Sequence, residues 1–96
     1  MKGTVSYVDF ERIRKHRGYV YFWQLLDLLK PDKDGDLSYK GYMQGDCNLF
    51  RFKYLSFSLH KDPMGEGTIS DSSNKPDKEW NYPSPNSVNE SNLRKV

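Results

Sequence analysis

Aromatic residues are spread unevenly along this chain, and their distribution limits which part of it can fold. The 96-residue sequence holds 2 Trp, 7 Tyr and 5 Phe residues, and all of them except Trp80 and Tyr82 lie before residue 58. Residues 63–96 consist mostly of Ser, Asn, Asp, Glu, Lys, Pro and Gly. Such a segment buries too little apolar surface to offset the conformational entropy that folding removes. The sequence therefore predicts a compact domain over residues 1–62 and a flexible polar tail over residues 63–96.

The small size of the predicted domain makes its stability depend on the aromatic rings. A domain of about 60 residues buries only about 60% of the surface of its unfolded chain. The single cysteine, Cys47, excludes an intramolecular disulfide and a zinc site built on several cysteines. Each buried ring removes about 150–250 Å² from water. Aromatic packing, or contact with a partner, must therefore supply the stability.

The N-terminal part of the chain is predicted to hold a strand and then a helix. Residues 4–8 alternate in the way of a short strand. Asp9 is a suitable helix N-cap and Gly18 a suitable helix stop. A short helix between them would bury Phe10 and Ile13 and expose its basic residues.

Residues 21–29 give conflicting signals. Residues 19–23 all favour β-structure, but four apolar residues then recur at helical spacing: Phe22, Leu25, Leu26 and Leu29. Because this stripe outweighs a weak intrinsic preference, the sequence predicts a helix here. Whether residues 9–29 form one helix or two stays open.

Residues 37–60 show the pattern of a β-hairpin. Apolar and polar residues alternate over residues 37–43, residues 44–46 supply the reversal, and residues 49–60 carry a second strand. The predicted fold class is therefore α+β: a small single domain with an N-terminal strand, one or two helices and a β-hairpin, then a flexible C-terminal tail.

The second hairpin strand contains a conflict of side-chain parity. In a regular strand the even-numbered Phe50, Phe52 and Tyr54 would point to one face. Three later apolar residues are odd-numbered and would point to the other face: Leu55, Phe57 and Leu59. A strand cannot exchange its buried face without a cause, because a one-residue slip turns every side chain over. Three causes stay open: a β-bulge near Tyr54 and Leu55, a strand covered on both faces, or one face that binds a partner.

Surplus aromatic surface favours a protein that docks on a larger protein partner. The candidate protein-binding residues are Phe50, Phe52, Tyr54, Trp80 and Tyr82. The last two stand with two prolines in an otherwise polar stretch, and such aromatics often anchor a flexible segment on a partner. We expect a small, non-catalytic regulatory protein, and a second copy of the chain is another partner that the sequence leaves open.

Nucleic-acid binding is the alternative. Basic residues cluster on the first predicted helix, and two more alternate with aromatic residues on the last strand, as in proteins that stack bases and follow phosphates. The candidates are Arg12, Arg14, Lys15, Arg17, Arg51 and Lys53. The formal net charge of only +2 is low for a protein of this class.

The chain offers little for metal binding or catalysis. Asp32, Asp34 and Asp36 alternate like the first ligands of a calcium loop, but the glycine and the final glutamate of such a loop are replaced by Leu37 and Met43. We expect a solvated turn, with no metal and no cofactor; calcium binding is a remote alternative. No spacing of His16, His60 and Cys47 indicates a catalytic pair, so we expect no enzymatic activity.

The N-terminus suggests a cytoplasmic protein. Residues 1–6 carry one positive charge but no apolar stretch of the length that a secretory signal needs. The longest apolar run ends well short of the roughly 20 residues that span a membrane.

Overall fold

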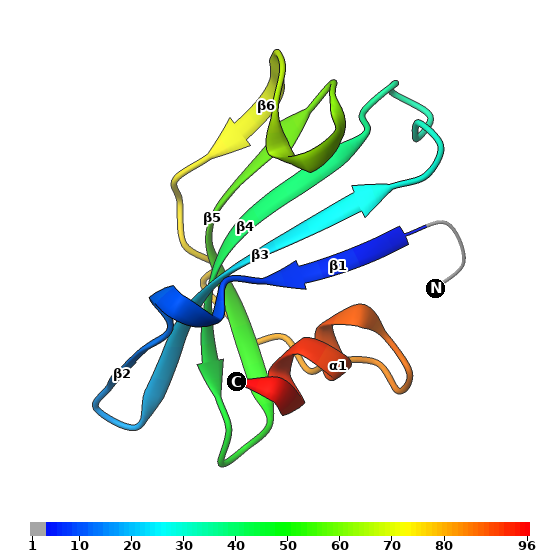
Figure 1. Cartoon of the computed structure of the whole chain (residues 1–96). Helices are drawn as coiled ribbons and strands as arrows, with labels where there is room; N and C mark the ends of the chain where they lie inside the picture. The colour runs from blue at the N-terminus through cyan, green and yellow to red at the C-terminus, as the bar shows by residue number, and fades with distance from the viewer. Residues whose placement is uncertain (1–3) are drawn as a thin grey trace.

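Three long strands with alternating side chains form the sheet that dominates this protein. The computed structural model describes residues 4–96, so Met1–Gly3, on which the expected absence of a secretory signal partly depends, lie outside the described residues. The sheet is antiparallel, with strand order β1-β3-β4-β5-β6, and β2 extends the same edge of β3 as β1 (Figure 1). In chain order the elements are β1 (Thr4–Val8), the 3-10 helix η1 (Phe10–Arg12), β2 (Arg14–His16), β3 (Tyr19–Leu28), β4 (Ser38–Asp46), β5 (Arg51–His60), the 3-10 helix η2 (Pro63–Gly65), β6 (Ile69–Ser73) and α1 (Val88–Lys95).

The predicted α+β fold class is wrong, because residues 9–29 form no α-helix. They include η1, β2 and all of β3, and β3 lies inside the sheet. Its backbone groups are therefore paired on both sides, and Val20 and Phe22 are buried on one face while Tyr21 and Trp23 occupy the other. The apolar residues at helical spacing did not mark a buried stripe, since Leu29 is 68% exposed.

The glycine that was interpreted as a helix stop turns a hairpin instead. Gly18, with φ of 84°, and Arg17, with φ of 52°, connect β2 to β3. Positive φ at both central residues suits the twist of a tight β-hairpin. The same residue type ends helices and reverses strands, so glycine alone did not distinguish the two structures.

The N-terminal strand and the hairpin are confirmed, and so is the β-bulge, but the predicted reversal at residues 44–46 is wrong: these residues belong to β4, and the chain turns at residues 47–50. Tyr42 of β4 pairs with Ser56, and Met43 pairs with Tyr54, so Leu55 is the extra residue on β5. The bulge shifts the alternation of side chains by one residue, so that odd-numbered residues after it face the same side as even-numbered residues before it. As a result, one face of β5 carries aromatic and apolar residues on both sides of the bulge: Phe52, Tyr54, Phe57 and Leu59.

Helix α1 covers one end of this inner face. Leu93, which is 3% exposed, reaches Gly45, where a Cβ atom would lie only 2.9 Å from the Leu93 side chain. Asn92 is also buried and donates hydrogen bonds to the Gln24 side chain (3.0 Å) and to Ser6 Oγ (2.8 Å). The helix therefore completes a core of four buried apolar residues: Val20, Phe22, Met43 and Phe52.

Residues 63–96 lie against the sheet, unlike the flexible tail in the predicted fold class. Strand β6 pairs with the second half of β5, and Asn81 exchanges two backbone hydrogen bonds with Phe52 (2.8 and 2.9 Å) in the first half. Ser87 caps α1 by accepting a hydrogen bond from the Glu90 amide (3.1 Å). Whether residues 1–62 fold independently of residues 63–96 stays a prediction.

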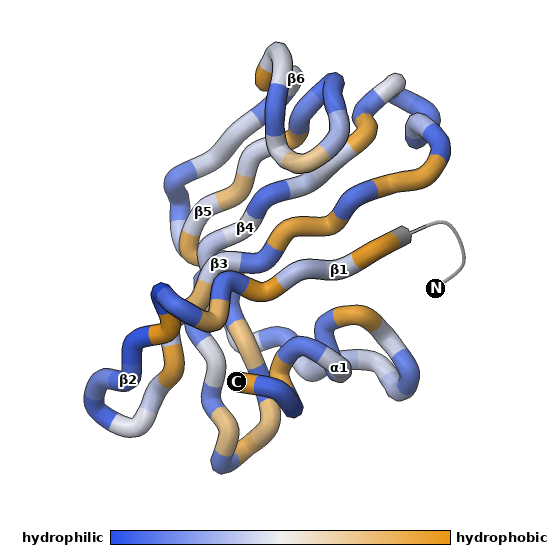
Figure 2. Tube along the Cα trace, in the orientation of Figure 1, coloured by the Kyte–Doolittle hydropathy of each residue, from blue (hydrophilic) through white to orange (hydrophobic). Residues whose placement is uncertain are grey.

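Hydrophobic and hydrophilic positions are interspersed along the strands (Figure 2). Among the described residues, no helix has the length and apolar character needed to cross a membrane.

Replacing Leu93 with Ala should lower the free energy of unfolding by about 2–5 kcal/mol, because it leaves a cavity between α1 and the sheet. Urea unfolding monitored by tryptophan fluorescence measures this change. Leu49→Ala is the matched control: Leu49 is 59% exposed, so its loss should change stability by less than about 0.5 kcal/mol. Equal effects of the two substitutions would contradict the packing of α1 on the core.

Candidate interaction surface

The outer face of the sheet, opposite α1, carries a row of aromatic side chains. Tyr19, Tyr21 and Trp23 alternate with the buried residues of β3 and are half-buried. Tyr42 pairs with Trp23 across the strands, with ring centroids 4.8 Å apart, and its ring lies 6.4 Å from that of Tyr21. We call these four residues together with Trp80 the aromatic face. Because other side chains form the buried core, the rings of the aromatic face are not part of it.

Trp80 joins the aromatic face from the C-terminal segment. Its ring centroid lies 5.5 Å from that of Tyr19, 4.3 Å from the Arg51 guanidinium carbon and 4.9 Å from Lys53 Nζ. The contacts with Arg51 and Lys53 are cation–π interactions, and the neighbouring Asn81 pairs with β5, so the indole is held in place.

An ion pair orients the cation beneath Trp80. Arg51 Nε lies 2.9 Å from Asp46 Oδ2, and both side chains are largely buried. Burial acts to raise the pKa of Asp46, but the hydrogen bond from Arg51 and the amides of Leu49 and Asn48 outweigh it, so the pKa is lowered. Asp46 therefore stays ionised and keeps the guanidinium in place.

The candidate protein-binding residues divide into two groups. Phe52 is 6% exposed and packs edge-on against the half-buried Tyr54 at 5.8 Å, while Phe50 lies under Arg94 of α1 at 5.2 Å. These three rings are occupied inside the domain. Trp80 is half-buried on the aromatic face and Tyr82 is 66% exposed, so these two are placed where a partner can reach them.

Four of the six candidate nucleic-acid-binding residues were predicted on a basic helix, and the structure has no such helix. Arg12 ends η1, and Arg14, Lys15 and Arg17 belong to the β2–β3 hairpin, all of them exposed. Arg51 and Lys53 lie on β5, separated from that hairpin by β4, and both contact Trp80.

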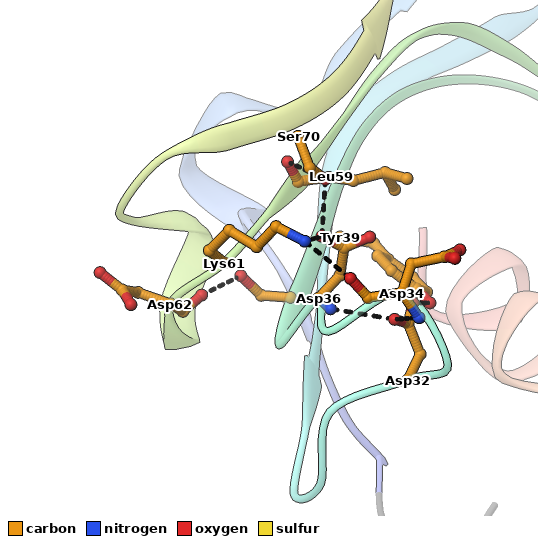
Figure 3. Close-up of polar contacts among 9 residues, drawn as sticks. Asp32, Asp34, Asp36, Tyr39, Leu59, Lys61, Asp62 and Ser70 are labelled. Atoms are coloured by element: carbon orange, nitrogen blue, oxygen red, sulfur yellow. Dashed lines mark hydrogen bonds and ion pairs between the residues drawn. The ribbon is translucent and has the colours of Figure 1, made fainter.

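The polar groups of the acidic turn, residues 32–36, are paired with other groups of the chain (Figure 3). Carboxylate oxygens of Asp32, Asp34 and Asp36 lie within 4.8 Å of one another. The ammonium group of Lys61 lies 3.3 Å from Asp36 Oδ1 and donates to the Asp34 carbonyl (2.7 Å). Asp32 accepts the amides of Asp34 and Asp36, each at 2.9 Å, and the hydroxyl of Tyr39. The turn is thus closed by internal hydrogen bonds and an internal cation, and the absence of a metal stays a prediction.

The hydrogen bond between Tyr39 and Asp32 shifts both groups. It lowers the pKa of Asp32, with help from the amide of Asp36. It also raises the pKa of Tyr39 from 10.0 to about 12, and burial and the neighbouring carboxylates add to this effect.

Sequence reasoning missed four members of the aromatic face: Tyr19, Tyr21, Trp23 and Tyr42. Three of them stand at alternate positions of a run in which every residue favours β-structure. That alternation was the available signal, and the apolar residues at helical spacing concealed it.

Comparisons with known proteins give a family and a fold. The model of a family described as surface-adhesin protein E matches residues 1–96. Two solved structures of Haemophilus influenzae protein E are similar: crystal form II, with a TM-score of 0.69 and 15% identity over 99% of this chain and 87% of that chain, and the selenomethionine form, with a TM-score of 0.67 and 13% identity over 99% and 85%. No curated protein matches the chain.

These findings correct the expected location and refine the expected class of function. A family of surface adhesins conflicts with a cytoplasmic, regulatory protein, so both of those expectations are wrong. Adhesins are interaction proteins, which agrees with the expectation of a protein that binds a protein partner. Neither the family match nor the structural match supports nucleic-acid binding or a homo-oligomer.

Replacing Tyr39 with Phe should weaken the dependence of stability on alkaline pH. The folded-state pKa of Tyr39 is above its ordinary value, so its stabilising contribution is present below pH 10.0 and is lost as the pH rises to about 12. Urea unfolding across this range should therefore show a shallower decline for Tyr39→Phe than for the parent. Tyr7→Phe, at a residue that is 43% exposed, is the control and should retain the parent's decline. Identical curves for Tyr39→Phe and the parent would contradict the contribution of this hydrogen bond.

Proposed function

Because the chain belongs to the surface-adhesin protein E family, we propose that it is a surface protein that docks on a larger protein partner through the aromatic face. The observation that carries this proposal is the group of half-buried rings on the sheet face opposite α1, with Trp80 held over two cations. The proposed activity is binding and involves no catalysis.

The composition of the aromatic face suits a protein interface. Trp, Tyr and Arg are the residue types that dominate the energetics of such interfaces. The face combines these types, since Arg51 lies directly beneath Trp80. Rings already fixed by neighbours lose little conformational entropy when a partner binds, so more of the contact energy contributes to affinity.

The C-terminal segment contributes to the proposed interface without being a free anchor. Trp80 is packed on Tyr19 and Arg51, whereas Tyr82, two residues further along, is largely exposed. The proposed interface therefore extends from the sheet onto this segment. Phe50, Phe52 and Tyr54 support it from within the domain.

Replacing Trp80 with Ala should weaken partner binding by about 30-fold or more, the loss expected at an interface hot spot. Tyr82→Ala should weaken binding by a smaller factor, because its ring is not packed in advance. Binding of the labelled chain to an array of purified extracellular and serum proteins, followed by titration of the proteins that bind, measures both effects.

Ile69→Ala is the matched control for this experiment. Ile69 is an apolar residue of β6 that is 54% exposed, so its loss should leave affinity unchanged. Circular dichroism and urea unfolding check that each variant is folded. Binding by folded Trp80→Ala that equals the parent's, or no binding by the parent to any protein on the array, would reject the proposed function.

A further inference from the structure

A cleft borders the aromatic face where η1 and β2 lie along the edge of β3. It is open to solvent, has a volume of about 490 Å³ and is lined by Glu11, Arg12, Ile13, Arg14, Trp23 and Tyr42. A second hollow of about 360 Å³ shares Arg12 and Trp23 with the cleft and is also lined by Lys40. Two rings that contact each other thus stand beside three cationic side chains.

The cleft carries an excess of positive charge. Arg12 lies 3.4 Å from Asp9 in an exposed pair, and among residues 4–96 no carboxylate forms an ion pair with Arg14. Glu11 is the one acidic side chain that lines the cleft, and Asp9 lines the second hollow. Lys40 Nζ adds a further cation 5.8 Å from the Trp23 ring. A ligand that brings a negative charge next to an apolar group would complement this arrangement.

Resting on the proposed function, we propose that this cleft receives an acidic peptide segment of the protein partner. A carboxylate of the segment pairs with the guanidinium of Arg14, whose planar fork matches a carboxylate with two parallel hydrogen bonds. An aromatic or aliphatic side chain next to that carboxylate packs on Trp23 and Tyr42. The segment thereby supplies an anion for Arg14 and covers the accessible parts of the two half-buried rings.

Charge and shape favour a carboxylate-bearing peptide over a polyanion. A nucleic acid or a sulfated glycan carries closely spaced charges and needs a continuous row of cations. Here Glu11 lies among the cations of the cleft, where it would repel a second anionic group. The arrangement therefore suits one carboxylate flanked by apolar surface.

Affinity for a random copolymer of glutamate and tyrosine tests the proposal with the full chain. Arg14→Gln should weaken binding of the fluorescein-labelled copolymer by about tenfold, the loss of a charge-assisted hydrogen bond. Lys15→Gln is the matched control and should change affinity by less than about twofold. Both residues are exposed on β2 and both substitutions remove one positive charge, but Arg14 lies opposite Tyr21 and lines the cleft, whereas Lys15 lies opposite Val20.

Competition identifies the class of ligand. Polyglutamate without tyrosine should bind more weakly than the copolymer, and heparin and oligo-thymidine should compete poorly. The proposal is overturned if the parent does not bind the copolymer, if Arg14→Gln and Lys15→Gln weaken it equally, or if heparin or oligo-thymidine binds more tightly with the same dependence on Arg14. Binding to array proteins that depends on Trp80 but not on Arg14 would overturn this inference and leave the proposed function intact.

Discussion

A single extra residue, Leu55, determines that the apolar side chains in both halves of β5 face the same side of the sheet. Tyr42 and Met43 are adjacent on β4, but their partners on β5 are Ser56 and Tyr54. Without this bulge, the second half of β5 would turn its apolar side chains outward, because side chains alternate strictly along a strand. With it, Phe57 and Leu59 lie on the same face as the core.

This arrangement separates the buried core from the proposed interaction surface. The inner face holds the buried apolar residues and is covered at one end by α1, which approaches closely because Gly45 has no side chain. The outer face is left with the rings of β3 and β4 and with Trp80, which the C-terminal segment delivers over Arg51. This aromatic surface, in a family of surface adhesins, is the basis of the proposed contact with a partner.

The sequence predicted the hairpin and the N-terminal strand because those segments alternate without a competing pattern. It also indicated the bulge as one of three causes of the parity conflict, and pairing with β4 selected that cause. It failed over residues 9–29, where spaced leucines resembled a helix and only the neighbouring strands reveal that the backbone of β3 is paired on both sides. Three of the four missed residues of the aromatic face, Tyr19, Tyr21 and Trp23, follow from that one error, whereas Tyr42 lies in the hairpin that the sequence predicted. The proposed surface location rests on family membership, since nothing in the composition distinguishes a surface protein from a cytoplasmic one.

By itself, the sequence determined that the aromatic residues must stabilise so small a domain, that Trp80 and Tyr82 differ from the rest of the C-terminal segment, and that residues 37–60 reverse as a hairpin. These conclusions depend on composition and local alternation, which act over a few residues. Only the tertiary structure decided which rings are buried, that residues 63–96 close the edge of β5 and one end of the core, and that Arg14 and Trp23 line the same cleft. The reason is that burial and charge pairing arise between strands and segments distant in the chain, and local periodicity carries no information about which of them become neighbours.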